Sequence, residues 1–347
     1  MKRFSIIIFS SLIFFSCKKE YKPRSIDSVT IKEFTIDSTS IRAIKVINEN
    51  TVYYAGSNGK IGTTTNAGET WDIETIHFQD SITPNFRSIA ENNGYIYALS
   101  IANPALLYKI KGKQNELVYK EIHEKVFYDS MHFFDNKKDG IAVGDPTEDC
   151  PSIIITSDGG ANWEKIPCSQ LPKLVEGEAF FAASNTNIKI LGDTVWIATG
   201  GTKARVLKST DKGKTWNTYN TPFIQGDGPQ GIYSIDFYDQ NTGIAIGGNY
   251  AKPEDNCKNK AVTTDGGITW QIVADNENPG YKSCIQYIPN TFGKEVIAVG
   301  KTGISFSNDG GNTWKEISTK GFYTIQFVNE NIAWLAGNNK IAKMTLP

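Results

Sequence analysis

The sequence predicts an all-β chain folded as a seven-bladed β-propeller of four-stranded antiparallel blades. A turn pattern, Ser/Thr-x-Asp-x-Gly-x-Thr-Trp, recurs along the chain, and its tryptophans are residues 71, 163, 216, 270 and 314. Their spacing gives a unit of about 45–55 residues, which is typical of a propeller blade. Between the turns, short apolar runs rich in Val, Ile and Tyr alternate with polar turn residues, as strands do.

The repeated turn has a local folding explanation. In the copy at residues 263–270, Asp265 can accept hydrogen bonds from backbone N–H groups, and the glycines after it tolerate positive φ. Trp270 then starts the next strand and can bury its ring between layers. We therefore expect the turns to be structural rather than ligand-binding. The other copies are residues 156–163, 209–216, 307–314 and, more weakly, 64–71.

The first residues predict export. Lys2 and Arg3 precede an apolar run at residues 6–15, and this run is too short to span a membrane as a helix. Cys17 follows a small residue, as in a bacterial lipobox, so residues 1–17 are predicted to be a lipoprotein signal peptide that leaves a lipidated Cys17. The alternative is an ordinary signal peptide or a short anchor. Residues 18–29 read as a polar tether, and residues 30–347 as one propeller domain.

Seven strand pairs predict the blades. They lie at residues 41–56, 86–100, 131–144, 179–200, 232–247, 284–300 and 323–337. A third and a fourth strand follow each pair, except that the last blade has only residues 341–346 as a third strand. The strand at residues 31–36 belongs to none of these pairs. We expect it to complete the last blade and to remove its exposed edge. A shift in one boundary would give six or eight blades instead.

Composition excludes several function classes. The formal net charge is −1 and the chain has few arginines, so a nucleic-acid partner is not expected. We find no dinucleotide-binding or haem motif and no ligand spacing for a metal, and we predict neither cofactor nor metal. The expected state is a monomer.

The cysteines predict disulfides, because exported proteins reach oxidising compartments in which thiols form disulfides. Cys150 and Cys168 lie at similar distances on either side of the Asp158 turn, so they should face each other across two strands. Cys257 and Cys284 are the second candidate pair.

Loop lengths point to one functional face. The long connections, at residues 145–151, 169–178, 221–231 and 249–260, all fall on one face over blades three to five. Candidate ligand-binding residues gather there: Asp129, Asp145, Glu176, Glu178, Lys203, Arg205, Gln230, Tyr233, Asn249 and Tyr250. The alternative is that these are ordinary solvated loops whose carboxylates cap turns.

Several segments carry a resemblance to known propellers. They are residues 127–131 (Phe-Tyr-Asp-Ser-Met), 144–146 (Gly-Asp-Pro), 177–185, 199–201, 231–234 and 247–250. Together with the repeated turns, they are similar to exported bacterial propellers with BNR or Asp-box repeats, a group often labelled oxidoreductase or glycosyl hydrolase. The group also looks like photosystem II assembly factors, which are binding proteins. Its sialidase-like members imply three arginines around a carboxylate, for which this propeller has Arg42, Arg87 and Arg205.

Two functions follow as hypotheses. The first is a lipid-anchored scaffold at the bacterial cell envelope, periplasmic or on the outer membrane, that binds a protein partner or a glycan through the loop-rich face. The second is a glycoside hydrolase or lyase that uses Asp129, Asp145 or Glu178, with Tyr233 or Tyr250 assisting, and it requires two carboxyl groups to converge across a pocket. We expect the first, because no catalytic signature is complete.

Overall fold

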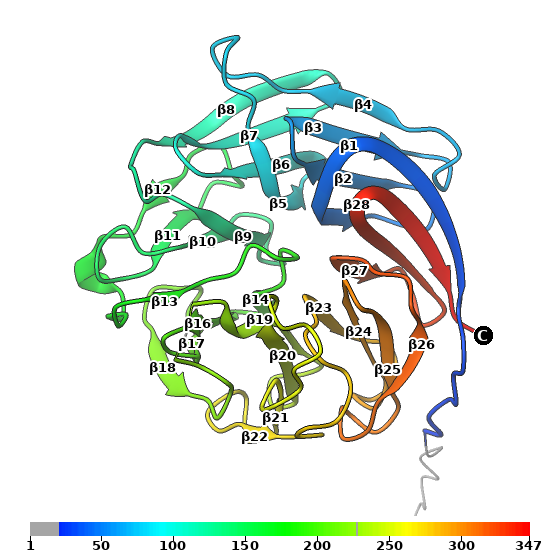
Figure 1. The fold of residues 1–347 in the computed structure, drawn as a ribbon. Coiled ribbons are helices and arrows are strands. Elements are labelled where there is room, and N and C mark those ends of the chain that lie inside the picture. The colour runs from blue at the N-terminus through cyan, green and yellow to red at the C-terminus, as the bar shows by residue number, and fades with distance from the viewer. Residues whose placement is uncertain (1–20, 227) are drawn as a thin grey trace, which may run out of the picture.

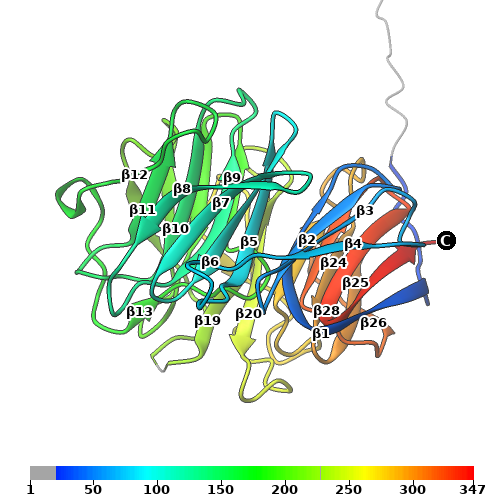
Figure 2. The same cartoon turned by 90° about the horizontal axis from the view of Figure 1, so that it is seen from above.

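The computed structural model describes residues 21–226 and 228–347. Their strands form antiparallel sheets arranged in a ring around a central axis (Figure 1), and a view from above shows the sheets standing side by side around it (Figure 2). Cys17 and the predicted signal peptide lie outside the described residues. Among the residues that the structure describes, no helix is long and apolar enough to cross a membrane.

Four of the sheets have four strands each. One contains β5 (Asn85–Asn92), β6 (Tyr95–Ile101), β7 (Ala105–Lys111) and β8 (Gln114–Glu121). The next contains β9 (Tyr128–Phe133), β10 (Gly140–Gly144), β11 (Ser152–Thr156) and β12 (Glu164–Lys165), and a short 3-10 turn, η1 (Cys168–Gln170), follows it. The third contains β14 (Ile188–Leu191), β15 (Thr194–Ala198), β17 (Arg205–Ser209) and β18 (Asn217–Asn220). The fourth contains β23 (Cys284–Tyr287), β24 (Val296–Gly300), β25 (Gly303–Ser307) and β26 (Lys315–Ser318).

Two further sheets have six strands each. One contains β13 (Glu178–Ala179), β16 (Gly200–Gly201), β19 (Gln230–Phe237), β20 (Gly243–Asn249), β21 (Lys260–Thr263) and β22 (Gln271–Ile272). The other contains β27 (Thr324–Phe327), β28 (Ile332–Thr345), β1 (Thr30–Val46), β2 (Val52–Gly56), β3 (Lys60–Thr64) and β4 (Asp72–Thr75).

The prediction of seven blades is wrong, because hydrogen bonding joins the described strands into six sheets. The physical reason lies in the longest strand, β1. Its first part pairs with β28 and its second part pairs with β2, so the first and the last predicted units share one continuous sheet. The predicted pairing of residues 31–36 with the C-terminal strand is confirmed, with Phe34 opposite Ile341 and Ile31 opposite Met344. This pairing removes the free edge that the chain ends would otherwise expose.

The repeated turns bond internally. At Asp265, one carboxylate oxygen accepts the Thr263 hydroxyl at 2.8 Å and the Thr269 backbone N–H at 2.9 Å, and the other accepts the Thr269 hydroxyl at 2.6 Å. The Trp270 indole N–H donates to the Gly267 carbonyl at 3.1 Å. The carboxylate is therefore satisfied within its own turn, which fixes the hairpin and the tryptophan beside it. Comparable bonds form at Asn66, Asp158, Asp211 and Asp309.

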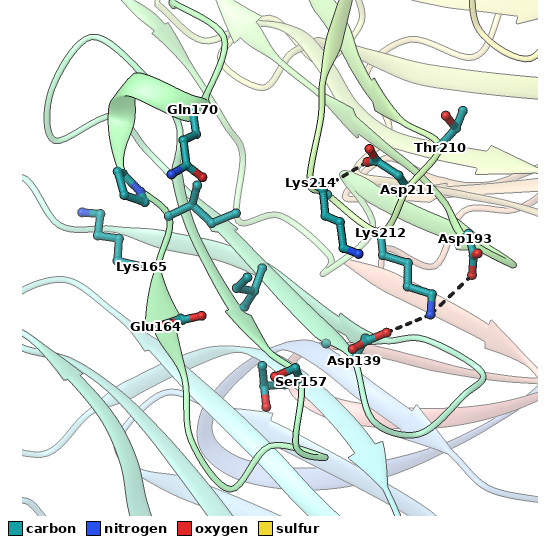
Figure 3. A pocket seen from close by; sticks show the side chains of 16 residues that line it. Asp139, Ser157, Glu164, Lys165, Gln170, Asp193, Thr210, Asp211, Lys212 and Lys214 are labelled. Carbon is teal, nitrogen blue, oxygen red and sulfur yellow. Dashed lines mark hydrogen bonds and ion pairs between the residues drawn. The ribbon is translucent and has the colours of Figure 1, made fainter.

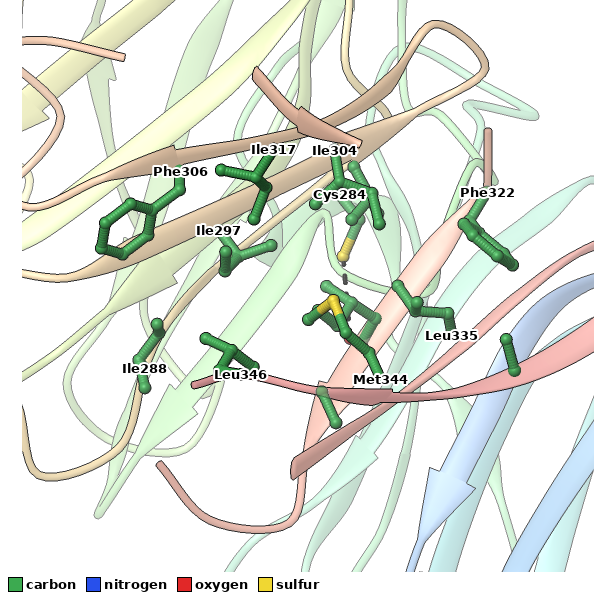
Figure 4. Packing of buried hydrophobic residues seen from close by; sticks show 14 of the residues in the cluster. Cys284, Ile288, Ile297, Ile304, Phe306, Ile317, Phe322, Leu335, Met344 and Leu346 are labelled. Atoms are coloured by element: carbon green, nitrogen blue, oxygen red, sulfur yellow. Dashed lines mark hydrogen bonds between the residues drawn. The ribbon is translucent and has the colours of Figure 1, made fainter. Parts of the chain in front are cut away.

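Apolar side chains of neighbouring sheets form the core between them. In one such cluster, Ile297 and Ile304 from the β23–β26 sheet pack with Leu335 and Met344 from β28 (Figure 4). Ile26, which precedes β1, is buried in the same cluster. In the predicted tether, residues 18–29, the described part contacts the ring through Tyr21, Arg24 and Ile26, whereas Lys22, Ser25 and Ser28 are exposed.

An ion pair fixes this N-terminal segment. The Arg24 guanidinium donates to one Glu295 carboxylate oxygen at 2.7 and 2.9 Å, and the Arg24 backbone N–H donates to the other oxygen. The Glu295 side chain is fully buried. Because a buried carboxylate is costly without its partners, this contact ties the segment to the loop between β23 and β24.

Cys150 and Cys168 are joined by a disulfide with a Cα–Cα distance of 5.7 Å, across the turn that the sequence indicated. The second expected bridge is absent, since Cys257 and Cys284 are free thiols. Cys284 is buried at the start of β23, where the hydroxyls of Thr186 and Thr324 contact its sulfur. Cys257 lies half-buried in the long loop before β21.

We expect Arg24→Ala to lower the free energy of unfolding by about 2–4 kcal/mol, because it leaves Glu295 buried without its cation. Denaturant unfolding of the domain measures this. Lys22→Ala, an exposed position in the same segment, is the control. Equal stability of the two variants would contradict a docked segment.

Candidate functional site

Residues 180–187, here called the axial segment, cross the centre of the ring. The sequence predicted a strand pair over residues 179–200, and an antiparallel pair forms within that range as β14 and β15, whereas residues 180–187 lie outside this pair, between β13 and β14. The Asn185 side chain donates to the Ile89 carbonyl of β5 at 2.9 Å and accepts the Met131 N–H of β9 at 3.0 Å. On the other side, the Ser184 hydroxyl donates to the Ser283 carbonyl at 2.7 Å.

Further bonds hold the segment all round the axis. The Thr324 hydroxyl donates to the Ser184 carbonyl at 3.1 Å, and the hydroxyls of Thr186 and Ser234 lie 2.7 Å apart. His132 contacts the Asn185 carbonyl at 2.9 Å, and burial lowers the pKa of this histidine to about 4. The axial segment thus closes the centre and forms the floor of a pocket at one end of it.

This pocket, here called the axial pocket, has a volume of about 400 Å³. It is lined by residues 180–183 of the axial segment and by residues in the inner strands or in the loops beside them. The lining residues are Arg42, Arg87, Phe127, Asp145, Ala179, Phe180, Phe181, Ala182, Ala183, Tyr233, Tyr250, Tyr281, Ser283, Lys301 and Tyr323.

Two arginines lie side by side in the pocket. The Arg42 guanidinium stacks over the Tyr323 ring, 4.1 Å from its centroid, and donates to the Ala183 carbonyl at 3.3 Å. Arg87 donates to the Ala182 carbonyl at 3.4 Å. Burial and, next, repulsion from Arg42 lower the pKa of Arg87. Neither arginine forms an ion pair with any described residue, and the lining holds three basic groups, Arg42, Arg87 and Lys301, against one carboxyl group, that of Asp145.

Aromatic rings form the walls. Tyr233 stacks on Phe181 with centroids 4.0 Å apart, and Tyr281 meets Tyr233 edge-on at 4.8 Å. The Tyr233 hydroxyl donates to the Pro229 carbonyl at 2.8 Å, and burial raises its pKa. This hydroxyl is therefore a structural donor rather than a poised nucleophile. Tyr250 stands at the rim and is 52% exposed.

Two carboxyl groups lie at the pocket and below it. One Asp145 oxygen accepts the Phe180 N–H at 2.8 Å, and burial raises the pKa of Asp145 to about 6. Asp129 is fully buried, and its pKa is raised well above the usual range by burial and then by repulsion from Asp145, while Arg87 opposes the rise. A raised pKa reduces the negative charge that Asp129 offers to Arg87.

The structure separates the predicted site residues. Asp145, Tyr233 and Tyr250 line the axial pocket, and Asp129 is buried near Arg87. Glu178 instead forms a buried ion pair with Arg205, with bonds of 2.6 and 2.9 Å, and also accepts the Thr199 hydroxyl. Neither Glu178 nor Arg205 lines the pocket, and the same holds for Glu176, Lys203, Gln230 and Asn249.

Sequence reasoning missed much of the site. Phe127, Phe181, Tyr281, Lys301 and Tyr323 were not singled out. Most of them stand just before or at the start of an innermost strand, and that position was the available signal. Arg42 and Arg87 were considered only as members of an arginine triad with Arg205, which lies outside the pocket.

A second hollow, of about 790 Å³, lies between the β9–β12 sheet and the β14–β18 sheet (Figure 3). One of its lysines is held by neighbouring carboxylates, and the turn at its edge is hydrogen-bonded internally. Lys212 contacts Asp139 at 2.9 Å and Asp193 at 3.7 Å, and the Lys214 backbone N–H donates to Asp211 at 3.1 Å. The axial pocket, whose arginines lack ion-pair partners among the described residues, is therefore the candidate functional site.

No protein-family model matches the chain, and no curated protein matches its sequence. Among solved structures, the fold is similar to YCF48 bound to D1 peptide, with a TM-score of 0.66 and 15% identity over 93% of this chain and 100% of that chain. For YCF48 from Cyanidioschyzon merolae, the TM-score is 0.63 with 15% identity over 91% and 98% of the two chains. For the WD40 repeats of RRP9, the TM-score is 0.67 with 11% identity over 94% and 100%. These similarities establish the β-propeller fold alone.

Asp145→Asn tests the electrostatics of the pocket. Because the folded-state pKa of Asp145 is about 6, above the unfolded value of about 3.9, the native state holds this proton more tightly, and stability falls as pH rises through about 6. We expect the variant to gain ~1–2 kcal/mol over the parent at about pH 8 and nothing at about pH 4. Denaturant unfolding at both pH values measures this, with Glu148→Gln on the same loop as the control. An equal gain at both pH values would contradict the assignment.

Proposed function

We propose that this chain is a binding scaffold whose axial pocket receives a segment of a partner protein. The observation that carries the proposal is the pocket itself, where two arginines without ion-pair partners among the described residues stand between aromatic walls. Arginine and tyrosine are the residues that dominate binding energy at protein interfaces. A similar propeller, YCF48, has been solved with D1 peptide bound, which supports the use of this fold for peptide binding.

The placement of the carboxyl groups favours binding over glycoside hydrolysis. Hydrolysis needs two carboxyl groups facing each other across the substrate. Glu178 is held by Arg205 outside the pocket, and Asp129 is buried beneath it. Asp145 is thus the single carboxyl group among the described lining residues.

We further propose that the protein is exported and lipid-anchored through Cys17. The docked segment that begins at Tyr21 supports a defined orientation. Tyr21 contacts Phe292 and Glu295, in the loop that follows β23, whereas Ser283 at the other end of β23 lines the axial pocket. An anchor attached there would leave the pocket facing away from the membrane and open to a partner.

A photo-crosslinking amino acid at position 250 tests the scaffold function. Tyr250 is 52% exposed at the rim, and Phe292 is 64% exposed at the opposite end of the ring. We expect a protein adduct from position 250 and none from position 292, resolved by mass spectrometry of the envelope fraction. Adducts of the same kind from both positions, or from position 292 alone, would contradict docking at the pocket.

Cys17→Ser tests the anchor. We expect the variant to move from the membrane fraction to the soluble fraction and to lose incorporation of labelled fatty acid, because a lipidated cysteine holds the chain at the bilayer. Cys257→Ser, at a half-buried thiol of the folded domain, is the control and should remain in the membrane fraction. A membrane-bound, unlabelled Cys17→Ser protein would show that a different element attaches it.

A further inference from the structure

We propose that the axial pocket recognises the carboxylate of an aspartate or glutamate side chain within an extended peptide, and that Arg42 and Arg87 hold this carboxylate. The inference rests on the peptide-binding function proposed above and adds the chemistry that the pocket selects. The lining of the pocket holds more basic than acidic groups, with Arg42, Arg87 and Lys301 against Asp145.

Two like charges held close together in a partly buried site repel each other. Burial and, next, the charge of Arg42 lower the pKa of Arg87. Asp129, which attracts Arg87, has a raised pKa and so offers less compensation, while Asp145, whose pKa is raised to about 6, supplies one negative charge above that pH. An arrangement of this kind is stabilised by an anion from outside, because a carboxylate between the two groups would turn repulsion into attraction.

The arginines also have hydrogen-bonding capacity to spare. Each guanidinium carries five N–H donors, and within the described residues Arg42 donates one bond of 3.3 Å to Ala183 and Arg87 one bond of 3.4 Å to Ala182. The Arg42 Nε is buried with no hydrogen-bond partner among the described residues. Guanidinium groups bind carboxylates through paired N–H donors, so the free donors match this ligand.

The backbone of the pocket argues for a side-chain carboxylate rather than a chain terminus. Proteins often capture a terminal carboxylate in a nest of backbone N–H groups. Here the axial segment turns the Ala182 and Ala183 carbonyls toward the arginines. The Phe180 N–H is already bonded to Asp145, and the Ala183 N–H to the Phe181 carbonyl.

The walls indicate what should flank the acidic residue. Phe127 lies 6.0 Å beneath the Arg87 guanidinium, and Tyr323 lies beneath that of Arg42. Tyr250 remains exposed at the rim. Because such rings pack well against other aromatic rings, we expect aromatic residues next to the carboxylate to increase affinity.

Three short fluorescent peptides test the proposal on the mature protein. The first contains Phe-Glu-Phe and is blocked at both ends, the second replaces Glu with Gln, and the third keeps Gln but has a free C-terminal carboxylate. Fluorescence anisotropy measures their affinities. We expect the Glu peptide to bind about tenfold or more tightly than either Gln peptide, because charge-assisted bonds are lost with the amide. Equal binding of the Glu and blocked Gln peptides would overturn the proposal, and so would tightest binding of the free-terminus peptide.

Variants of the two arginines test whether these residues cause the preference for the Glu peptide. Arg42→Gln and Arg87→Gln should each bring the affinity of the Glu peptide down to that of the blocked Gln peptide, whereas Lys113→Gln, which removes an exposed charge at the tip of the β7–β8 hairpin, should not. Arg42→Lys keeps the charge without the planar fork and should retain partial preference for Glu. Thermal unfolding of each variant confirms that it is folded. Glu preference that persists in both Gln variants would overturn the assignment to these arginines.

The crosslinking experiment separates this inference from the function on which it rests. A partner adduct at position 250 together with equal binding of Glu and Gln peptides would retain the scaffold and reject carboxylate recognition. Absence of both the adduct and peptide binding would reject both.

Discussion

Hydrogen bonding of the axial segment is the constraint on which the rest of this molecule depends. The inner strands β5, β9, β23 and the strands beside them turn polar groups toward the axis, and Ser184, Asn185 and Thr186 bond to them. Buried polar groups without partners destabilise a fold by about 1–3 kcal/mol each. The segment therefore closes the ring internally, and it also sets the depth of the axial pocket, because its backbone is the pocket floor.

The sequence predicts the fold well where the signal is local. Asp265 and Trp270 belong to a turn whose bonds lie within a few residues, so the pattern alone specifies it. The number of sheets is different, because it depends on how long β1 stays extended and on which partner each half finds. The sequence predicted the two partners, β28 for residues 31–36 and β2 within the pair at residues 41–56, but it did not show that both parts run on as one strand and so join the first and last units in a single sheet. The prediction of seven blades failed at this nonlocal step.

The same difference between local and nonlocal signals explains which site residues the sequence could predict. Of the residues that loop lengths singled out, Asp145, Tyr233 and Tyr250 line the axial pocket. Loop lengths could not show that the Glu178 side chain points away from the pocket and bonds Arg205, since a sequence gives no side-chain direction. Nor could they show that the axial segment leaves its sheet, because its residues fit the strand pattern of their neighbours. The direction of a side chain and the depth of the pocket depend on how the whole ring closes, so only the three-dimensional structure shows them.

Arg205 has different surroundings from Arg42 and Arg87 in the same chain. Arg205 donates to both oxygens of a buried Glu178 at 2.6 and 2.9 Å, so its charge is balanced and its donors are used. Arg42 and Arg87 meet neutral carbonyls at 3.3 and 3.4 Å and repel each other. Two uncharged side chains of similar volume would make the fold more stable than two arginines without ion-pair partners. In the binding function proposed above, the two arginines without ion-pair partners among the described residues are preorganised for a ligand that brings the opposite charge.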